Sequence, residues 1–412
     1  MTLDDVRKQS SVPPAIEHAE LLSYRGEFPI LQRKTYLNSC SLGAFSQRSM
    51  RGIEQFMQAW NEWGGHAWDE AWQGEINRVR QKFATIIGAQ LHEVAIVPNV
   101  STALSSIASA LDYNKRNRVV LADMDFPTLA YQWLVKQRLG VECSFVESPD
   151  QITVPSELFA ASVDERTALV ATSRVYYTSG YIQDIRAIAD IAHKNGAYLL
   201  VDDYQGTGQL PLNVVALDID FLVTGSLTWL LGGPGLAFVY IREGLHAQLE
   251  PAIAGWFGAR EQFQFKTREF AFRPEATRIE MGTPSMAAVY AAHGGLDLVL
   301  EASVESIGER TRYLTNDLIA RMHERGWKVR APREPELRNS IVMVELEAPQ
   351  DIVKALAAQN ILVDSRAGCV RISPYFYNTI EENAIVIDAV AEILREQKDG
   401  GQNGQAETAT TG

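Results

Sequence analysis

The stretch at residues 198–241 constrains the fold more than any other part of the chain. It holds three short apolar runs, which are typical of buried strands: 198–201, 221–224 and 236–241. The first run leads directly into a pair of aspartates, of which Asp202 is the first. A carboxylate at the end of a buried strand is costly unless a partner is present, and ligands of open α/β sheets bind at this end. Asp202 is therefore a candidate functional acid, and a capped or solvated loop acid is the alternative.

Apolar runs that suit strands alternate with amphipathic stretches that suit helices along much of the chain. Strands are predicted at 92–98, 118–122 and 167–171, and helices at 103–111 and 184–195. This alternation predicts a mostly parallel central sheet. The length of 412 residues suits two domains, or one large α/β unit with an appendage. We predict four parts: an N-terminal segment, a large domain, a smaller α+β domain and a disordered tail, at 1–45, 46–290, 291–396 and 397–412.

The balance of charge and the cysteine pattern exclude several classes of protein. The formal net charge of −13 argues against general binding to nucleic acid or to anionic membranes. The three cysteines form no CxxC pair, which suits a reducing compartment, and the histidines do not cluster at the spacing of metal ligands. No apolar secretory region begins the sequence, and no apolar run is long enough to span a bilayer. These features predict a cytoplasmic protein without a metal site.

The segment TGSLTWLLGG at 224–233, together with Asp202 and Gln205 before it, carries a family resemblance. It resembles the core of the class V aminotransferases, which are fold-type I enzymes that use pyridoxal 5′-phosphate (PLP). This family includes cysteine desulfurases, kynureninases and isopenicillin-epimerase-like proteins. The resemblance rests on six ordered motifs over about residues 27–394. It implies an α/β fold of the fold-type I PLP-transferase class, with helices on both faces of the sheet, a homodimer and a small amino-acid-like substrate.

The resemblance also implies a role for individual side chains. Asp202 would pair with the ring nitrogen of PLP, Gln205 would contact its 3-oxygen side, and Phe126 would stack on the ring. The phosphate would be bound by a loop and by a residue from the neighbouring subunit, so that the other cofactor-binding candidates are Val100, Ser101, Ser226 and Thr283. Asn38 and Arg371 would contact the substrate, Arg371 through its α-carboxylate, because the guanidinium fork holds a carboxylate in two places.

Each of these residue patterns also has an ordinary structural explanation. Ser101 near a helix start is commonly a helix cap, and so is Thr283 with a proline directly after it. Phe126 before a proline suits a core side chain at a turn, and Asn38 suits a strand-to-turn transition. An arginine in a strand, such as Arg371, is more often an ion-pair or surface residue. The order of the motifs along the chain favours the functional roles.

Thr228 stands where the family has the lysine that bonds covalently to PLP. A threonine cannot form that bond, and its hydroxyl is a poor base near neutral pH. Lys266 is a weak candidate to replace the missing lysine, and Lys34 is a weaker one still. Three explanations remain: a divergent enzyme that binds PLP without a covalent bond or has lost it, an engineered lysine-to-threonine variant, and a non-catalytic relative. The function predicted is transamination, lyase or epimerase-type chemistry on an amino-acid-type substrate, and the alternative is a cofactor-free binding or regulatory protein.

At two further positions the sequence differs from the pattern of the family, and the first difference argues against one of its branches. Cysteine desulfurases carry a cysteine on a mobile loop before the carboxylate-binding arginine, whereas Cys369 lies only two residues before Arg371. A persulfide relay is therefore not expected. Arg174 replaces the histidine usual at its position, which could alter the contacts to the ring or the substrate.

Overall fold

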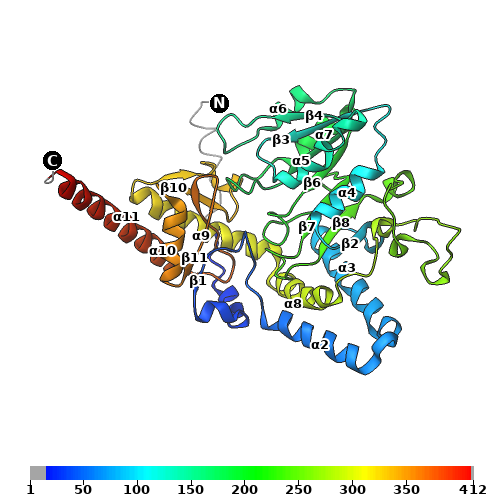
Figure 1. Cartoon of the computed structure of the whole chain (residues 1–412), viewed down its shortest axis with the longest axis horizontal. Helices are drawn as coiled ribbons and strands as arrows, with labels where there is room; N and C mark the ends of the chain where they lie inside the picture. The colour runs from blue at the N-terminus through cyan, green and yellow to red at the C-terminus, as the bar shows by residue number, and fades with distance from the viewer. Residues whose placement is uncertain (1–14, 410–412) are drawn as a thin grey trace, which may run out of the picture.

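The computed structural model describes residues 15–409, which contain two main sheets that lie apart in Figure 1. The larger sheet has seven strands, and β8 runs antiparallel to both of its neighbours while the other paired strands are parallel. Their spatial order is β2 (Val94–Val97), β8 (Ala237–Ile241), β7 (Phe221–Gly225), β6 (Tyr198–Asp202), β5 (Thr167–Ser173), β3 (Arg118–Ala122), β4 (Glu142–Val146).

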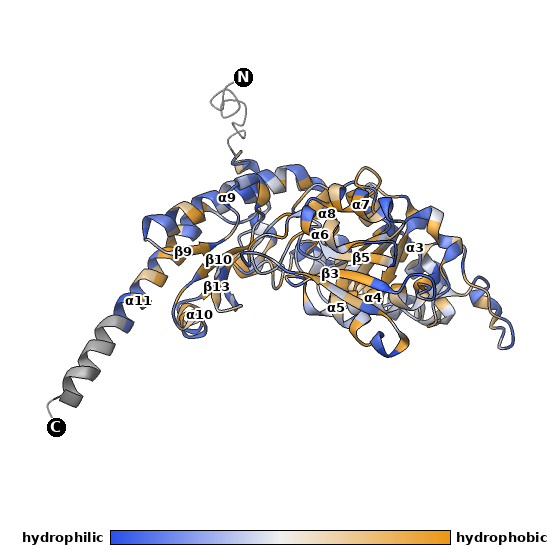
Figure 2. Ribbon diagram, turned by 90° about the horizontal axis from the view of Figure 1, so that it is seen from above, coloured by the Kyte–Doolittle hydropathy of each residue, from blue (hydrophilic) through white to orange (hydrophobic). Residues whose placement is uncertain are grey.

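Both faces of this sheet are buried because successive side chains of its strands enter two different hydrophobic clusters. In β6, Leu199 and Val201 belong to one cluster and Leu200 to the other. Helices on the first face are α2 (Gln47–Trp63), α3 (Gln73–Ile87), α6 (Ser156–Ser162), α7 (Ile185–Lys194) and α8 (Met286–Ala302). The second face is covered by α4 (Val100–Ala110) and α5 (Pro127–Leu134). Figure 2 shows the apolar strands enclosed by these helices. The predicted α/β fold class is thus confirmed.

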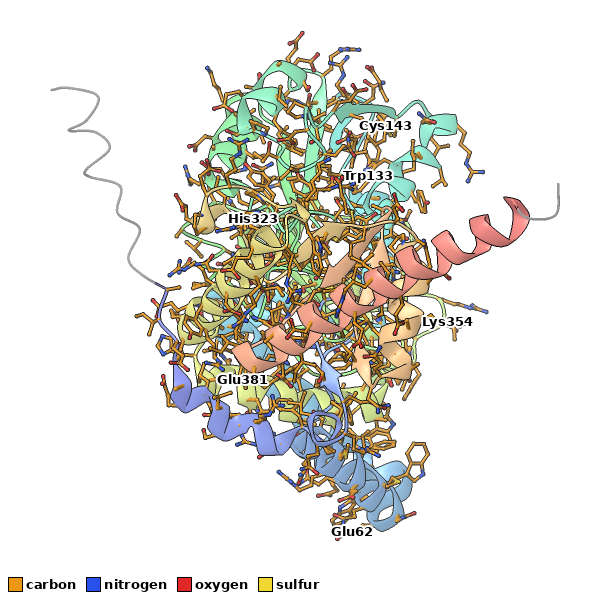
Figure 3. All side chains as sticks on the ribbon, turned by 90° about the vertical axis from the view of Figure 1, so that its left-hand side faces the viewer. Glu62, Trp133, Cys143, His323, Lys354 and Glu381 are labelled. Atoms are coloured by element: carbon orange, nitrogen blue, oxygen red, sulfur yellow. The ribbon has the colours of Figure 1, made fainter. Side chains whose placement is uncertain are left out.

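The smaller sheet is antiparallel and has the order β12 (Asp364–Arg366), β13 (Cys369–Ile372), β10 (Val342–Glu345), β9 (Lys328–Arg330). The helices α9 (Val304–Glu324), α10 (Pro349–Ala358) and α11 (Ile380–Ala409) accompany it. Figure 3 shows Glu381 at the start of α11 and the exposed side chain of Lys354 on α10. A short parallel pair, β1 (Thr35–Tyr36) with β11 (Ile361–Leu362), joins the N-terminal segment to this part.

Two of the predicted domain limits can be compared with the helices of the structure. The limit between 290 and 291 falls inside α8, and α11 extends through most of the stretch predicted as a disordered tail. The rest of that tail, 410–412, lies outside the described residues, as does the part of the N-terminal segment at 1–14. The division into domains stays a prediction.

The helices α2 and α8 approach each other closely at a glycine. A methyl group on Gly52 would lie 2.2 Å from the carbonyl oxygen of Tyr290, which is a backbone atom and cannot give way cheaply. We therefore expect Gly52→Val to lower the free energy of unfolding by about 3 kcal/mol, as overpacking does in a filled core. Urea unfolding measures this. The control is Gly74→Ala in α3, where no atom lies within 4 Å and alanine should stabilise the helix by up to about 1 kcal/mol. Equal effects of the two substitutions would contradict this packing.

Candidate active site

A cavity of about 430 Å³ lies at the carboxyl ends of the strands of the large sheet, and the arginines of the small sheet close its far side. The N-terminal segment crosses between the sheets, because Ser39 donates its N–H to the carbonyl of Ser373 and Gly43 donates to that of Leu227. Of the predicted site residues, those that line the cavity are Val100, Ser101, Phe126, Asp202, Gln205 and Arg371. The fold therefore brings together six positions that are far apart in the sequence.

Asp202 ends β6 and places a buried carboxyl group in this cavity. One of its oxygens accepts a hydrogen bond of 3.0 Å from the N–H of Tyr204. Burial raises the pKa of Asp202 to about 7, although that hydrogen bond opposes the rise, and the nearby carboxylates of Asp125 and Asp203 add to it. A group with this pKa would ionise fully beside a cation, so the site is suited to a positively charged ligand atom.

The shifted pKa of Asp202 links the stability of the ligand-free protein to pH. The pKa is raised in the folded state from an ordinary value of 3.8, so the folded state binds the proton more tightly, and stability falls as pH rises through about 4 to 7. We expect Asp202→Asn to remove this part of the loss, which amounts to at most about 4 kcal/mol for three pKa units. Urea unfolding at pH 5 and pH 8 measures it, with the exposed Asp69→Asn as control. The same pH dependence in wild type and Asp202→Asn would refute the shift.

The first turn of α4 opens toward the cavity. Asn99 is the N-cap, and its side chain accepts from the N–H of Thr102. The N–H groups of Val100 and Ser101 donate to no other described residue. The hydroxyl of Ser101 lies 2.7 Å from that of Thr128, which also lines the cavity. Free N–H groups, a helix dipole and two hydroxyls at one place are the features that suit an anion such as a phosphate. Because Asn99 caps the helix, Ser101 is not its cap.

Aromatic side chains form much of the cavity wall. Phe126 is half exposed, and its ring meets that of Tyr177 edge to face at a centroid distance of 5.3 Å. The ring of Tyr204 lies against Gly225, where a methyl group would come within 2.4 Å of it. Burial raises the pKa of Tyr204 to about 12, and the carboxyl of Asp202 adds to this effect. Tyr204 is therefore a hydrogen-bond donor at neutral pH, and the exposed face of Phe126 can stack on a flat ligand.

Arg371 extends from β13 into the cavity and is held by several acceptors. Its guanidinium donates to the carboxylate of Asp364 at 2.7 Å, to the hydroxyl of Ser41 at 2.6 Å and to the carbonyl of Tyr177 at 3.2 Å. Its buried Nε has no acceptor among the described residues. Burial works against ionisation of Asp364, but Ser41 and Arg371 outweigh it and hold the pKa of Asp364 below its usual value. Arg371 is thus held in position by three acceptors, and its Nε–H remains available to a ligand.

Two other predicted residues, Gln205 and Asn38, differ in how the protein already engages them. Gln205 lines the cavity, but its amide donates to the carbonyl of Cys40 at 3.1 Å and accepts from the indole of Trp229 at 2.9 Å. Asn38 is not among the lining residues; it pairs with Ser373 through the backbone, and its buried Oδ1 has no donor among the described residues.

The remaining three predicted residues lie outside the lining of the cavity. Thr228 is buried, and its hydroxyl donates to the carbonyl of Tyr204 at 3.4 Å, so that Leu227 forms the wall instead. The hydroxyl of Ser226 is also buried and bonds to backbone carbonyls of the following glycine-rich turn. Thr283 is exposed on the surface. The structure of one chain therefore does not bring these three side chains to the cavity.

No lysine lines the cavity in the part of the chain that the structure describes. Lys266 is exposed and pairs with Glu261 at 2.7 Å and with Glu269 at 3.2 Å, and Lys34 bonds to the side chain of Asn360. Neither lies at the site, so among the described residues no other lysine takes the place of an amine at position 228.

Arg174, which replaces the usual histidine and so could alter the contacts to the ring or the substrate, does not line the cavity. Its guanidinium forms two hydrogen bonds of 2.7 and 2.9 Å to the carboxylate of Asp203, and both groups are buried. Its other donors reach the carbonyls of Leu210 and Pro211. The physical reason for the difference is Asp203, a second buried carboxylate that needs a cation.

Sequence reasoning missed several side chains of the wall. Thr128 follows a proline at the first turn of α5, which was a recognisable helix start. Tyr204 and Leu227 lie one or two residues from predicted positions and Tyr177 lies three residues after Arg174, yet only the fold shows that they line the cavity. Arg366 lies in the small sheet, and its sequence neighbourhood gave no signal for its placement.

The residues present fit a phosphorylated, cationic heteroaromatic group such as PLP. Asp202 supplies a buried carboxyl, α4 supplies free N–H donors, and Phe126 supplies an aromatic face. Among the described residues, no group of three or more side chains could hold a metal ion, and no helix is long and apolar enough to cross a membrane.

Comparison with known proteins decides the family. The model of the aminotransferase class-V family matches residues 44–386. The chain belongs to the class-V aminotransferase family. A member from Bacillus subtilis (strain 168), named "Uncharacterized aminotransferase YcbU", is 34% identical over 368 residues, which cover 89% of this chain and 96% of that protein. The kynureninase of Geobacillus thermodenitrificans (strain NG80-2) is 27% identical over 416 residues, covering 96% of this chain and 95% of the enzyme.

Solved structures of other proteins share the fold. The apo cysteine desulfurase of Thermococcus onnurineus NA1 superimposes with a TM-score of 0.83 at 20% identity, over 93% of this chain and 100% of that one. A mutant of C-DES with glycine covalently linked to its PLP cofactor gives a TM-score of 0.80 at 21% identity, over 89% of this chain and 98% of that one. At such identities, the likeness shows the fold alone.

Proposed function

We propose that the cavity binds PLP without a covalent bond to the protein, and that the chain acts on a small amino-acid-type substrate by transamination, lyase or epimerase-type chemistry. The observation that carries the proposal is the Asp202 carboxyl, which is buried at the end of β6 and faces the cavity with one backbone donor. A buried carboxyl with so few partners costs free energy. A cationic ring nitrogen would offset that cost.

The phosphate and the ring of PLP, and the carboxylate of the substrate, would each be bound by a different group of the cavity. The N–H groups of Val100 and Ser101 and the hydroxyl of Thr128 would hold the phosphate. Phe126 would lie on the ring face, and Arg371 would hold the carboxylate of the substrate. When bound, PLP supplies an electron sink for the carbanion at the α-carbon of the substrate.

The proton chemistry would differ from that of relatives that carry a lysine. Thr228 lies behind Leu227 with its hydroxyl bound to a backbone carbonyl. The phenol of Tyr204 lines the cavity and stays protonated at neutral pH because burial raises its pKa to about 12. Tyr204 would therefore donate a hydrogen bond to an oxygen of the ligand, and it would be a poor general base.

Titration of the protein with PLP, followed by absorbance, tests the proposal. Wild type should bind PLP more tightly than pyridoxal, which lacks the phosphate, by tenfold or more. Asp202→Asn should weaken the binding of both by about tenfold or more, because a hydrogen bond to a charged group contributes about 1.5–3 kcal/mol. The exposed Asp69→Asn is the control and should bind like wild type. Equal affinity for PLP and pyridoxal, or an unaffected Asp202→Asn variant, would refute the assigned contacts.

The alternative is a cofactor-free binding or regulatory protein of the same fold. The observation that favours it is that the cavity has no lysine among the described residues and that Thr228 is buried behind its wall. This alternative predicts no saturable binding of PLP in the same titration.

We also propose that the protein is a homodimer, with Thr283 reaching the phosphate site of the second copy. Thr283 is exposed in one chain, and the nearby segment exposes Trp256, Phe263 and Phe265, whose exposed fractions are 38%, 52% and 73%. Three clustered aromatic side chains on a surface are typical of an interface. Sedimentation equilibrium should give the mass of two chains, and Phe265→Glu should shift the protein toward the monomer. A wild-type monomer would refute this assembly.

A further inference from the structure

We propose that Arg366 forms a second anion-binding position in the cavity, and that the substrate is therefore an amino acid with an acidic side chain. This proposal rests on the site assigned above, and it adds the substrate class. Arg366 and Arg371 both line the cavity, and Asp202 is the only acidic lining residue in the described part of the chain.

A tight hairpin holds Arg366 in place. It ends β12, and the two residues of the turn, Ala367 and Gly368, have φ angles of 48° and 75°. Two consecutive positive φ angles define a two-residue hairpin turn, which fixes the register of the strands. Arg366 is accordingly paired with Cys369, and the carbonyl of Ala367 accepts a hydrogen bond from Arg330. The position of the Arg366 backbone is therefore set by the sheet.

One carboxylate orients both arginines. Asp364 accepts from Arg366 at 2.9 Å through one oxygen and from Arg371 at 2.7 Å through the other. The two guanidinium groups thus flank a single side chain. Arg366 uses only Nη1 for its bonds, to Asp364 and to the carbonyl of Ser365, so its Nη2 and Nε donate to no described residue. A guanidinium has five N–H donors. The side chain of Arg366 is 49% exposed, and because Arg366 lines the cavity, the donors that remain can turn to a ligand there.

The charges match an acidic amino acid better than a neutral one. Arg366, Arg371 and Asp364 together carry a net charge of +1. An amino acid with an acidic side chain has two carboxylates and one ammonium, and so a net charge of −1. Each guanidinium could then bind one carboxylate, whereas a neutral amino acid has a single carboxylate and would leave Arg366 without a ligand anion. The cluster is also unlike the chain as a whole, whose formal net charge is −13, so its positive charge does not follow from composition.

Isothermal titration calorimetry with glutarate and butyrate tests this inference on the full chain without PLP. Wild type should bind glutarate about tenfold or more tightly than butyrate, since a second charge-assisted contact is formed. Arg366→Gln should abolish the preference by weakening glutarate, whereas Arg371→Gln should weaken both probes. Arg330→Gln is the matched control, because Arg330 bonds to the same turn but does not line the cavity. It should keep the preference for glutarate.

The possible outcomes separate this inference from the proposed function. Equal binding of glutarate and butyrate by wild type would overturn it, and so would a preference that survives in Arg366→Gln. Loss of the preference in Arg330→Gln would also overturn it, because the turn rather than the Arg366 guanidinium would then be responsible. If the preference holds while the protein fails to bind PLP, only the proposed function fails. If PLP binds and the preference is absent, only the substrate class fails.

Discussion

The Thr228→Lys variant is expected to become covalently linked to PLP on borohydride reduction, whereas wild type gains no such mass. Position 228 directly follows Leu227, which lines the cavity, and its hydroxyl bonds to the backbone carbonyl of Tyr204, another lining residue. The four-carbon stem of a lysine is long enough to pass the wall that a threonine does not reach. Intact-mass spectrometry after reduction measures the adduct, and the expected change is from none to nearly one adduct per chain.

The matched control for this experiment is Thr228→Met, which has a side chain of similar length but no amine. Both variants enlarge a side chain that is 1% exposed, so urea unfolding should accompany them to show that they are equally folded. A folded Thr228→Lys variant that binds PLP but gives no adduct would contradict the placement of residue 228 beside the cofactor site.

The second large effect is expected for Arg174→Met, which should lower the free energy of unfolding by about 3–5 kcal/mol. This substitution leaves the carboxylate of Asp203 buried without a cation. Asp203 is fully buried and loses both hydrogen bonds to the guanidinium. Urea unfolding measures the loss. Adding Asp203→Asn to the variant should recover part of it, because the uncompensated charge is then gone.

A surface ion pair serves as the control for Arg174. Arg186 pairs with Asp190 one helical turn away, and both side chains are largely exposed. Arg186→Met should cost no more than about 0.5 kcal/mol, as is usual for exposed pairs. An equally small effect of Arg174→Met would contradict the conclusion that the buried Asp203 carboxylate depends on the Arg174 guanidinium.

The sequence predicted those strands and helices that have a clear local pattern, and it was less accurate for elements whose place depends on the whole fold. The strand at 118–122 was predicted with the bounds observed, because an apolar run is a local signal. The strand β4 was missed because it lies at the edge of the sheet and only one of its residues is buried. The start of α4 was placed three residues late, because Asn99 was not recognised as its cap.

For the candidate site, motif order located Asp202 and Arg371, and both line the cavity. Sequence alone did not show which side chains are already engaged. Gln205 is bonded to the protein on both sides of its amide, and Arg174 is held by Asp203. Such contacts join segments that are distant in the chain, so they follow from packing rather than from local pattern. Arg366 was missed for the same reason, since Asp364 and the hairpin place it.

We propose that the cavity holds PLP beside Asp202 without a covalent bond. Equilibrium dialysis of wild type against PLP, followed by borohydride treatment and denaturation, separates bound from covalently attached ligand. We expect one saturable PLP site per chain, with all of the ligand released on denaturation and no gain in protein mass. No saturable binding, or a PLP adduct that survives denaturation, would contradict it.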